Sequence, residues 1–414
     1  MSPAEGLGAR RAALQMLDAV LRRGQTLDSA AAAIRALPPP DRALAVAIAG
    51  ESLRRLPGLD ALIDSATRQR LPDDSKARMV LRLALAQKAG LDTPDHAVVA
   101  TALPLVDGGP RRLVHGVLGT LLRRGLPTMD APCLPDAVER RWREAWGEDV
   151  VHAARRAIAH RPPLDLTFAD DGEAQAFGGI SLAPKHARLE SSAVTELPGF
   201  EAGRWWVQDL AASLPARLIR SRQTNVLDLC AAPGGKTMQL AAAGHRVTSV
   251  DASGHRLGRL RDNLARTHLA AELVEADALD WEPKQAFDAV LLDAPCSATG
   301  TFRRHPEVLY RAGPRIIAES ANLQARLLAH AARWIEPNGT LVYAVCSLEP
   351  EEGETIIAEF LSGNPEFVVD PPQPGELPDF VTPTPDGCVR ILPGLLEDKG
   401  GLDGFFIARL VRRG

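Results

Sequence analysis

Residues 226–237 read VLDLCAAPGGKT, an apolar run that leads into a Pro-Gly-Gly turn and then into a segment with helical character. In open α/β sheets, ligands bind where a strand ends and the next loop leads into a helix. Glycines 234 and 235 allow the backbone to approach a ligand closely, and the first turn of the helix offers free N–H groups. The segment therefore predicts a strand, a ligand-binding turn and a helix.

Apolar strands and amphipathic helices alternate after Trp205. The expected strands are 225–229, 246–251, 271–275, 289–293 and 339–345, with helices such as 257–267 and 316–334 between them. This alternation is typical of a Rossmann-like α/β domain, a mostly parallel sheet covered on both faces. Residues 405–410 (FFIARL) are expected to add a late strand, for which an antiparallel direction fits.

The front of the chain has a different pattern. Leucines recur at helical spacing in residues 12–23, and further amphipathic segments cover 73–89, 94–106 and 111–124. Asp28 and Asp41 stand where helix N-caps are expected. Residues 137–160 look helical, and 164–200 contain short strand-like pieces among Gly, Pro and Ala. We expect an all-α bundle at 1–126, a linker and small α+β insert at 127–203, and the α/β domain at 204–414.

Composition excludes several classes of protein. The chain has 414 residues, 45% of them hydrophobic and 24% charged, which argues against collagen-like, coiled-coil or wholly disordered structure. It contains no run of about 18 apolar residues and no signal-peptide pattern at its start, so we expect a cytoplasmic protein with no membrane partner. The net charge is −4, but residues 1–125 carry 18 Lys and Arg against 12 Asp and Glu. A basic front is compatible with polyanion binding, and equally with an ordinary solvated surface.

Three kinds of cofactor use a turn of this type. A phosphate-binding P-loop fits residues 235–237 (GKT), but Cys230 replaces its first glycine, and a dinucleotide fingerprint is absent. The third kind is S-adenosylmethionine, whose ribose calls for an acid at the end of the second strand, where Asp251 stands. Asp277 follows the third strand, near where the adenine amino group would lie. Helix capping is the alternative for either acid alone.

Five cysteines, with no CxxC pair, argue against a zinc cage or a disulfide framework, so we expect no metal. Cys296 and Cys346 follow the fourth and fifth strands. Neighbouring parallel strands lie about 4.8 Å apart, so both thiols are expected to face the crevice of the cofactor loop. A lone cysteine is more often a small buried hydrophobe, but two at successive strand ends suggest catalysis. One reaction that needs thiols is methylation at C5 of a pyrimidine, because a thiolate added at C6 makes C5 nucleophilic.

Three motifs, in a fixed order along the chain, resemble those of one known protein family. The motifs are DLCAAPGGKT (228–237), DAPCSATG (293–300) followed by RRHPE (303–307), and VCS (345–347) followed by EPEEGE (349–354). Together they resemble the bacterial 16S ribosomal RNA (cytosine-5)-methyltransferase B family, the Sun-type enzymes. Residues 94–97 and 113–124 resemble that family's NusB-like helical domain, and VQD (207–209) and DGFF (403–406) extend the match over nearly the whole chain.

The resemblance implies a role for each matching residue. Cys346 would be the nucleophile, Cys296 would assist release of the product, and Asp293 would lie between cofactor and base. S-adenosylmethionine would be held by Cys230, Ala231, Ala232, Pro233, Gly234, Gly235, Lys236, Asp251, Asp277 and Asp293. The implied partner of this RNA-binding protein is small-subunit ribosomal RNA, naked or partly assembled, and a monomer is expected.

Some positions depart from the family pattern. Val345 replaces a usual Thr, Leu309 a usual Lys, Asp165 a usual Arg and Gly119 another usual Arg, while His115 replaces an Asn. These departures suggest a weakened or rewired RNA-contacting periphery. Two other hypotheses remain: the same chemistry on transfer RNA or DNA, and a ribosome-assembly or RNA-binding factor with a vestigial methyltransferase domain. DNA cytosine methyltransferases use the thiol equivalent to Cys296. Which cysteine is essential therefore separates methylation of ribosomal RNA from the same chemistry on transfer RNA or DNA.

Overall fold

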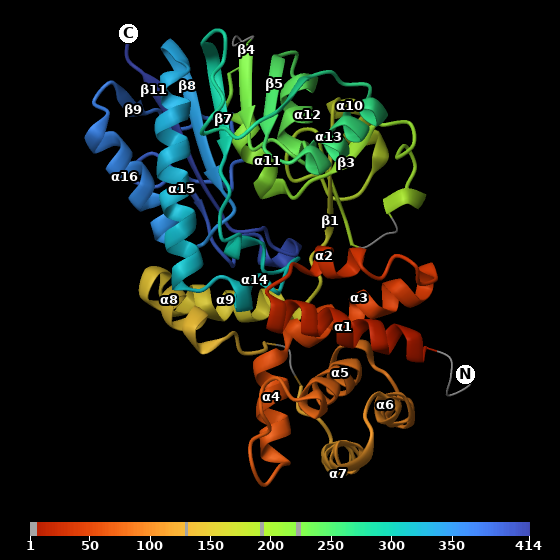
Figure 1. Ribbon diagram of the computed structural model, residues 1–414. Helices are drawn as coiled ribbons and strands as arrows, with labels where there is room; N and C mark the ends of the chain where they lie inside the picture. The colour runs from red at the N-terminus through yellow and green to blue at the C-terminus, as the bar shows by residue number, and fades with distance from the viewer. Residues whose placement is uncertain (1–5, 129–130, 191–193, 221–224) are drawn as a thin grey trace. The chain divides into compact units, whose positions relative to one another are not determined.

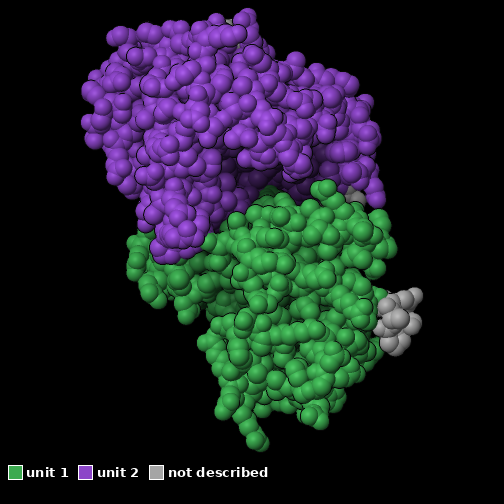
Figure 2. All heavy atoms as spheres, in the orientation of Figure 1, with its two compact units in different colours: residues 1–161, 302–311 green, residues 162–301, 312–414 purple. Residues whose placement is uncertain are grey.

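The computed structural model describes residues 6–128, 131–190, 194–220 and 225–414. These divide into two compact units (Figure 2). Unit 1 contains residues up to 161 together with 302–311, and unit 2 contains 162–301 and 312–414. The division does not coincide with the expected boundary near 126, because the helices after it belong with unit 1. Among the described residues, every helix is too short or too polar to cross a lipid bilayer.

Unit 1 is built from helices. They are α1 (Leu7–Arg23), α2 (Leu27–Ala32), α3 (Pro39–Arg54), α4 (Leu56–Ser65), α5 (Lys76–Leu91), α6 (Asp95–Ala102), α7 (Gly108–Arg124), α8 (Asp136–Trp146), α9 (Glu148–Ala159) and the short α14 (Val308–Arg311). Helix α5 is central, since residues 77–87 are all buried, and it packs against α3, α4, α6 and α7. The expected helix at 137–160 is two helices, because Gly147 adopts a positive φ of 86° between α8 and α9.

Two expected helix caps are wrong. Helix α2 is capped by Thr26, whose hydroxyl accepts a hydrogen bond from Ser29 N at 3.1 Å, and Asp28 lies in the first turn. Helix α3 begins after Pro38 with prolines in its first turn, where Asp41 also lies. Prolines suit the first helical positions because the N–H they lack would be unsatisfied there. The two acids still face the positive end of the helix dipole.

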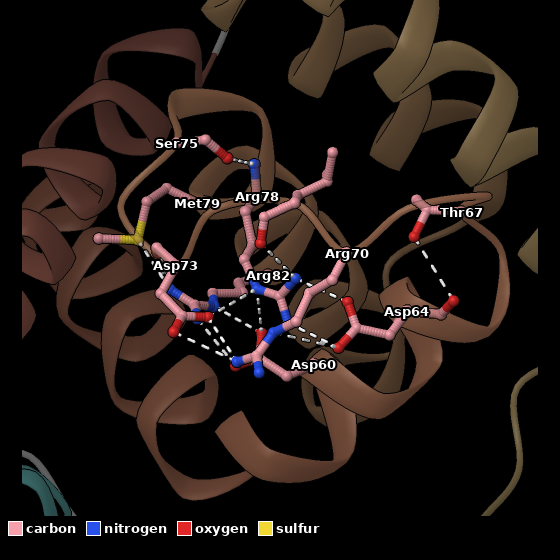
Figure 3. A network of polar contacts seen from close by, with 10 residues as sticks. Asp60, Asp64, Thr67, Arg70, Asp73, Ser75, Arg78, Met79 and Arg82 are labelled. Atoms are coloured by element: carbon pink, nitrogen blue, oxygen red, sulfur yellow. Dashed lines mark hydrogen bonds and ion pairs between the residues drawn. The ribbon is translucent and has the colours of Figure 1, made fainter.

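A network of arginines and aspartates, buried at Arg78 and Arg82 and exposed at Arg70, joins α4 to α5 (Figure 3). Arg78 is fully buried and makes two hydrogen bonds to the Asp64 carboxylate, at 2.7 and 3.0 Å, and one to Asp60 at 3.1 Å. Arg82 makes two more to Asp60, at 2.7 and 2.8 Å. The hydrogen bonds from Arg78 lower the pKa of Asp64. The network satisfies a charge that would otherwise be costly inside the helical core.

Unit 2 begins with a small three-stranded sheet in the order β2-β1-β3, formed by β1 (Leu164–Phe168), β2 (His186–Leu189) and β3 (Trp205–Val207). Helix α10 (Asp171–Phe177) packs on it, and Leu166, Phe168 and Trp205 form its core. Helix α11 (Leu210–Arg217) leads from it into the main sheet.

The main sheet has the strand order β10-β11-β8-β7-β4-β5-β6, and β9 pairs with β11 off this path. Figure 1 labels its central strands β11, β8, β7, β4 and β5. The strands are β4 (Asn225–Leu229), β5 (Arg246–Asp251), β6 (Glu272–Glu275), β7 (Phe287–Asp293), β8 (Ile335–Val345), β9 (Phe367–Val369), β10 (Val389–Ile391) and β11 (Phe405–Arg412). Strands β4 to β8 pair in parallel, and β11 runs antiparallel to β8. The predicted parallel sheet and its antiparallel late strand are confirmed.

Helices cover both faces of this sheet, which explains the continuous apolar character of its strands. Leu227 and Leu229 of β4 pack with residues of α15 (Pro314–Arg333) and α16 (Glu354–Gly363), while Val226 packs with α11. Helices α12 (Gly235–Ala242) and α13 (Gly254–Thr267) pack together through Met238, Leu257 and Leu260. The carboxyl ends of β4, β5, β7 and β8 meet at one edge, which carries the candidate site.

Candidate active site

The loop after β4 has the shape that its glycines predict. Cys230 has a φ of 59°, the Ala232–Pro233 bond is cis, and Gly234 has a φ of 105° at the start of α12. A Cβ on Gly234 would overlap the end of the Leu260 side chain of α13, which would have to move. The positive φ is the stronger reason for glycine at this position. The first turn of α12 follows directly and presents its N–H groups beside the loop.

Asp251 is the last residue of β5 and Asp277 follows β6, as predicted. Asp251 is buried, and its carboxylate accepts hydrogen bonds from Ala232 N at 3.1 Å and Ser253 N at 3.0 Å. Asp277 is exposed, and its Oδ1 accepts a hydrogen bond from Leu279 N at 2.9 Å. Neither acid caps a helix: Ser253 is the N-cap of α13, and the residues after Asp277 form a turn, so the capping alternative is wrong for both. Asp251 also ties the end of β5 to the glycine turn.

Asp228 is a buried acid that the sequence analysis did not single out. It lies in β4 and accepts a hydrogen bond from the Thr237 hydroxyl at 2.5 Å, and that hydroxyl lies 3.1 Å from the Ser249 hydroxyl. Burial raises the pKa of Asp228 to about 7. The only sequence signal for a buried acid here was the position of Asp228 in an apolar strand, directly before the loop.

Lys236 and Asp293 form an ion pair, with Nζ 2.7 Å from Oδ2. Lys236 is nearly buried and also lies 5.4 Å from the centre of the Phe405 ring. About a third of the Asp293 side chain is exposed. The pair connects the first turn of α12, directly after the Pro-Gly-Gly loop, to the end of β7.

Cys296 and Cys346 lie together, with their sulfur atoms 3.4 Å apart. Their strands, β7 and β8, are parallel neighbours in which Asp293 is paired with Ala344 (Figure 1). The hydrogen bond to Cys346, together with burial, raises the pKa of the Cys296 thiol well above its usual range. Cys296 therefore stays protonated near neutral pH and is able to donate its S–H to Cys346. Burial raises the pKa of the Cys230 thiol to about 12, so this residue does not supply a thiolate.

The other motifs reach the same edge of the sheet, with one exception. Gly300 of the Cys296 loop accepts a hydrogen bond from Gly404 N at 2.8 Å and donates one to Cys346 O at 3.0 Å. Asp209 caps α11 and accepts a hydrogen bond from Asp403 N at 3.3 Å. The exception is the RRHPE segment (303–307), which belongs to unit 1.

The departures from the family pattern are partly explained by burial. Asp165 is 1% exposed and makes two hydrogen bonds with Arg188, at 2.6 and 2.8 Å, and one with Leu210 N at 3.0 Å. Burial alone would raise the pKa of Asp165, but Arg188 and His186 hold it well below its usual range. Leu309 and Val345 are buried as well. The interpretation of Asp165 as a change at an RNA-contacting surface is therefore wrong, because the residue is an internal anchor of unit 2.

Comparisons with known proteins agree with this architecture. The family model described as 16S rRNA methyltransferase RsmB/F matches residues 217–411, and that of the NusB family matches residues 7–123. A protein named ribosomal RNA small subunit methyltransferase B from Xylella fastidiosa strain Temecula1 is 34% identical over 99% of both chains. A protein of the same name from Klebsiella pneumoniae subsp. pneumoniae is 32% identical, again over 99% of both chains.

The chain belongs to the RsmB/F family of 16S rRNA methyltransferases.

Solved structures show the same fold for this RsmB/F-family chain. The crystal structure of PH0851 covers 98% of both chains with a TM-score of 0.75 at 21% identity. A methyltransferase homologue from Pyrococcus horikoshii covers 71% of this chain and 98% of its own, with a TM-score of 0.56 at 25% identity. Within the ranges the structure describes, no group of three or more His, Cys, Asp or Glu side chains is arranged to hold a metal ion.

Proposed function

We propose that this RsmB/F-family methyltransferase methylates C5 of a cytosine in small-subunit ribosomal RNA, with Cys346 as a covalent nucleophile. The observation that carries the proposal is the pair of sulfur atoms 3.4 Å apart, beside a loop closed by the Lys236–Asp293 ion pair. Two thiols and a carboxylate at one sheet edge are the groups that this reaction requires. The names of the relatives and the NusB-like helical domain favour ribosomal RNA as substrate.

The residues at the loop suit S-adenosylmethionine better than a phosphate cofactor. Residues Cys230 to Lys236 would hold it, with Asp251 and Asp277 toward its ribose and adenine and Asp293 toward its methyl group. The cationic side chain of Lys236 is already neutralised by Asp293, whereas a P-loop lysine must be available to phosphates. When bound, S-adenosylmethionine supplies an electrophilic methyl group that C5 takes up.

Four residues of the chain then have distinct roles in the reaction. The Cys346 thiolate adds to C6, and the electron pair of the C5–C6 double bond is displaced toward the N3 edge of the ring. The group near that edge is Asp293, whose carboxylate would accept a hydrogen bond from the N4 amino group while N3 takes up a proton from water, with Lys236 holding the carboxylate in place. After methylation the ring gives up its protons at C5 and N3 to water, the C5–C6 double bond forms again, and the sulfur of Cys346 leaves as thiolate. Cys296, next to that sulfur, assists this release.

Cysteine variants test the mechanism. Transfer of labelled methyl groups to unmodified small-subunit ribosomal RNA is expected at one cytosine with the wild-type chain, and to be lost in Cys346→Ala. Cys296→Ala is expected to accumulate a covalent protein–RNA adduct, visible as a slow band on a denaturing gel. Cys133→Ala, which removes an exposed cysteine of unit 1, serves as the control and should keep full activity.

Other outcomes separate the alternatives. Full turnover by Cys346→Ala with loss of activity in Cys296→Ala would contradict the assignment of the nucleophile. Label on transfer RNA alone would keep the mechanism and change the substrate. Cofactor binding without transfer to any RNA would favour a ribosome-assembly factor.

A further inference from the structure

Glu352 is a buried carboxylate that stands between the two cysteine loops. It ends the short 3-10 turn Pro350–Glu352 and is 0% exposed. Its Oε1 accepts hydrogen bonds from Ser297 N at 2.8 Å and Gln324 Nε2 at 3.1 Å. Its Oε2 accepts from the Ser347 hydroxyl at 2.5 Å and from the Ser297 hydroxyl. Four donors thus converge on one carboxylate.

The donors flank both cysteines. Ser297 directly follows Cys296, and Ser347 directly follows Cys346. Gln324 also donates to Pro295 O at 2.9 Å, so the Cys296 loop is held on both sides of the thiol. Through one side chain, Glu352 therefore connects the end of β7, the end of β8 and helix α15.

Hydrogen bonds, rather than an ion pair, hold this carboxylate. In the parts of the chain that the structure describes, no Lys, Arg or His side chain lies within ion-pair distance of Glu352. Burying a carboxylate costs free energy unless hydrogen bonds satisfy it, so the four donors offset a cost rather than add to the stability of the core. Its four hydrogen bonds instead restrict the geometry of the groups that donate them. The arrangement is better suited to positioning than to stabilising the core.

We propose that Glu352 is a positioning residue that holds the Cys296 and Cys346 loops together, so that the two sulfur atoms stay in contact. The roles of the two thiols rest on the proposed function, whereas the spacing of the sulfur atoms does not. Loss of the carboxylate leaves two serine hydroxyls and a buried backbone N–H without their acceptor, and the loops separate.

A dithiol reagent measures this spacing directly. Phenylarsine oxide reacts with two neighbouring thiols to form two As–S bonds, and its oxygen leaves as water with the two thiol protons. The wild-type chain is expected to bind one equivalent tightly, and Cys346→Ala to lose that binding. Glu352→Ala should weaken it roughly tenfold or more, because the second sulfur loses its high effective concentration.

Two further variants distinguish positioning from general destabilisation. Glu352→Gln should restore the wild-type affinity for the arsenical, since its amide oxygen accepts from Ser297 N and Gln324 while its NH₂ donates to the two hydroxyls. Glu351→Gln, an exposed neighbour in the same turn, is the matched control and should change nothing. If Glu352→Ala does not fold, Ser347→Ala is used instead. It removes one of the four hydrogen bonds to Glu352 and should also weaken binding of the arsenical.

Methyl transfer supplies the second readout. Glu352→Ala should lower kcat about 100-fold, as expected for misplaced reacting groups, with a KM for S-adenosylmethionine close to wild type and recovery in Glu352→Gln. Wild-type arsenical affinity in folded Glu352→Ala or Ser347→Ala would overturn the proposal. Arsenical binding that depends on Glu352, in a chain that methylates no RNA, would uphold the positioning role and contradict the proposed function instead.

Discussion

At the scale of single residues, the side chains of the candidate site are set by their immediate surroundings: a neighbouring thiol, an ion-pair partner or burial. Cys296 is kept as a thiol by its contact with Cys346, and Lys236 is neutralised by Asp293. Asp228 lies just before the Pro-Gly-Gly loop, and burial raises its pKa to about 7. These three states follow from environment, and none of them is visible in the residue types alone.

Asp228 gives the folded chain a pH dependence whose sign is fixed. Since its pKa is about 7 in the folded state and about 4 in the unfolded state, the folded state retains its proton more firmly. This residue's contribution to the free energy of unfolding is fully present below pH ~4 and is lost as the pH rises to about 7, by up to ~4 kcal/mol. Asp228→Asn should remove this dependence of the free energy of unfolding on pH, because Asn does not titrate.

Urea unfolding of both chains between pH 5 and 8, followed by tryptophan fluorescence, measures this difference. Asp262→Asn, on the exposed face of α13, is the control and should keep the wild-type pH profile. Parallel profiles for the wild-type chain and Asp228→Asn would show that Asp228 titrates normally.

At the scale of helices and strands, most of the fold could be predicted from hydrophobic periodicity. The strands around the site were placed within a few residues, because buried parallel strands have continuous apolar sequences. Helix ends were less predictable: Thr26 caps α2 in place of Asp28, since several residues near a helix start have the chemistry of a cap. Glu352 and Asp165 could not be placed, because their partners lie far away in the sequence.

The α4–α5 network predicts a local loss of stability. Arg78→Met keeps the volume of the side chain but leaves Asp64 without its two hydrogen bonds from Arg78. We expect the opening free energy of α4 and α5 to fall by about 2–3 kcal/mol, the contribution of hydrogen bonds to charged groups. Native-state hydrogen exchange of the amides of α5 measures this change.

Arg70→Met is the matched control for Arg78→Met. Arg70 belongs to the same network (Figure 3), but its side chain is 66% exposed where it pairs with Asp73. Its loss should change the opening free energy by less than ~1 kcal/mol, as for other exposed ion pairs. An equal fall in opening free energy in Arg78→Met and Arg70→Met would contradict the idea that the buried arginine contributes more than the exposed one.

At the scale of the whole molecule, charge is unevenly distributed along the chain. The excess of basic residues in 1–125 includes Arg112 and Arg124, both exposed on α7. If α7 contacts RNA phosphates, Arg112→Gln with Arg124→Gln should reduce the slope of log affinity against log salt by about 1–2. RNA-binding titrations of the full chain at several salt concentrations test this.

Arg315→Gln with Arg326→Gln provides a control of equal charge on the exposed side of α15 in unit 2. This pair should leave the salt slope at its wild-type value. The same slope in both double variants would show that the basic front acts only through overall charge.

The helical unit is not one continuous piece of chain. Residues 302–311 complete it: Phe302 packs on Trp142 with ring centres 5.4 Å apart, Tyr310 donates to Leu53 O at 2.7 Å, and Glu307 accepts from Leu27 N at 3.0 Å. Domains usually fold in the order in which they are synthesised. Here residues 1–161 are translated well before 302–311, so the helical unit remains incomplete until α12, β7 and the Cys296 loop of unit 2 have been translated. Completion of the helical unit is thereby linked to synthesis of the Lys236–Asp293 pair and Cys296, while β8 and Cys346 follow later.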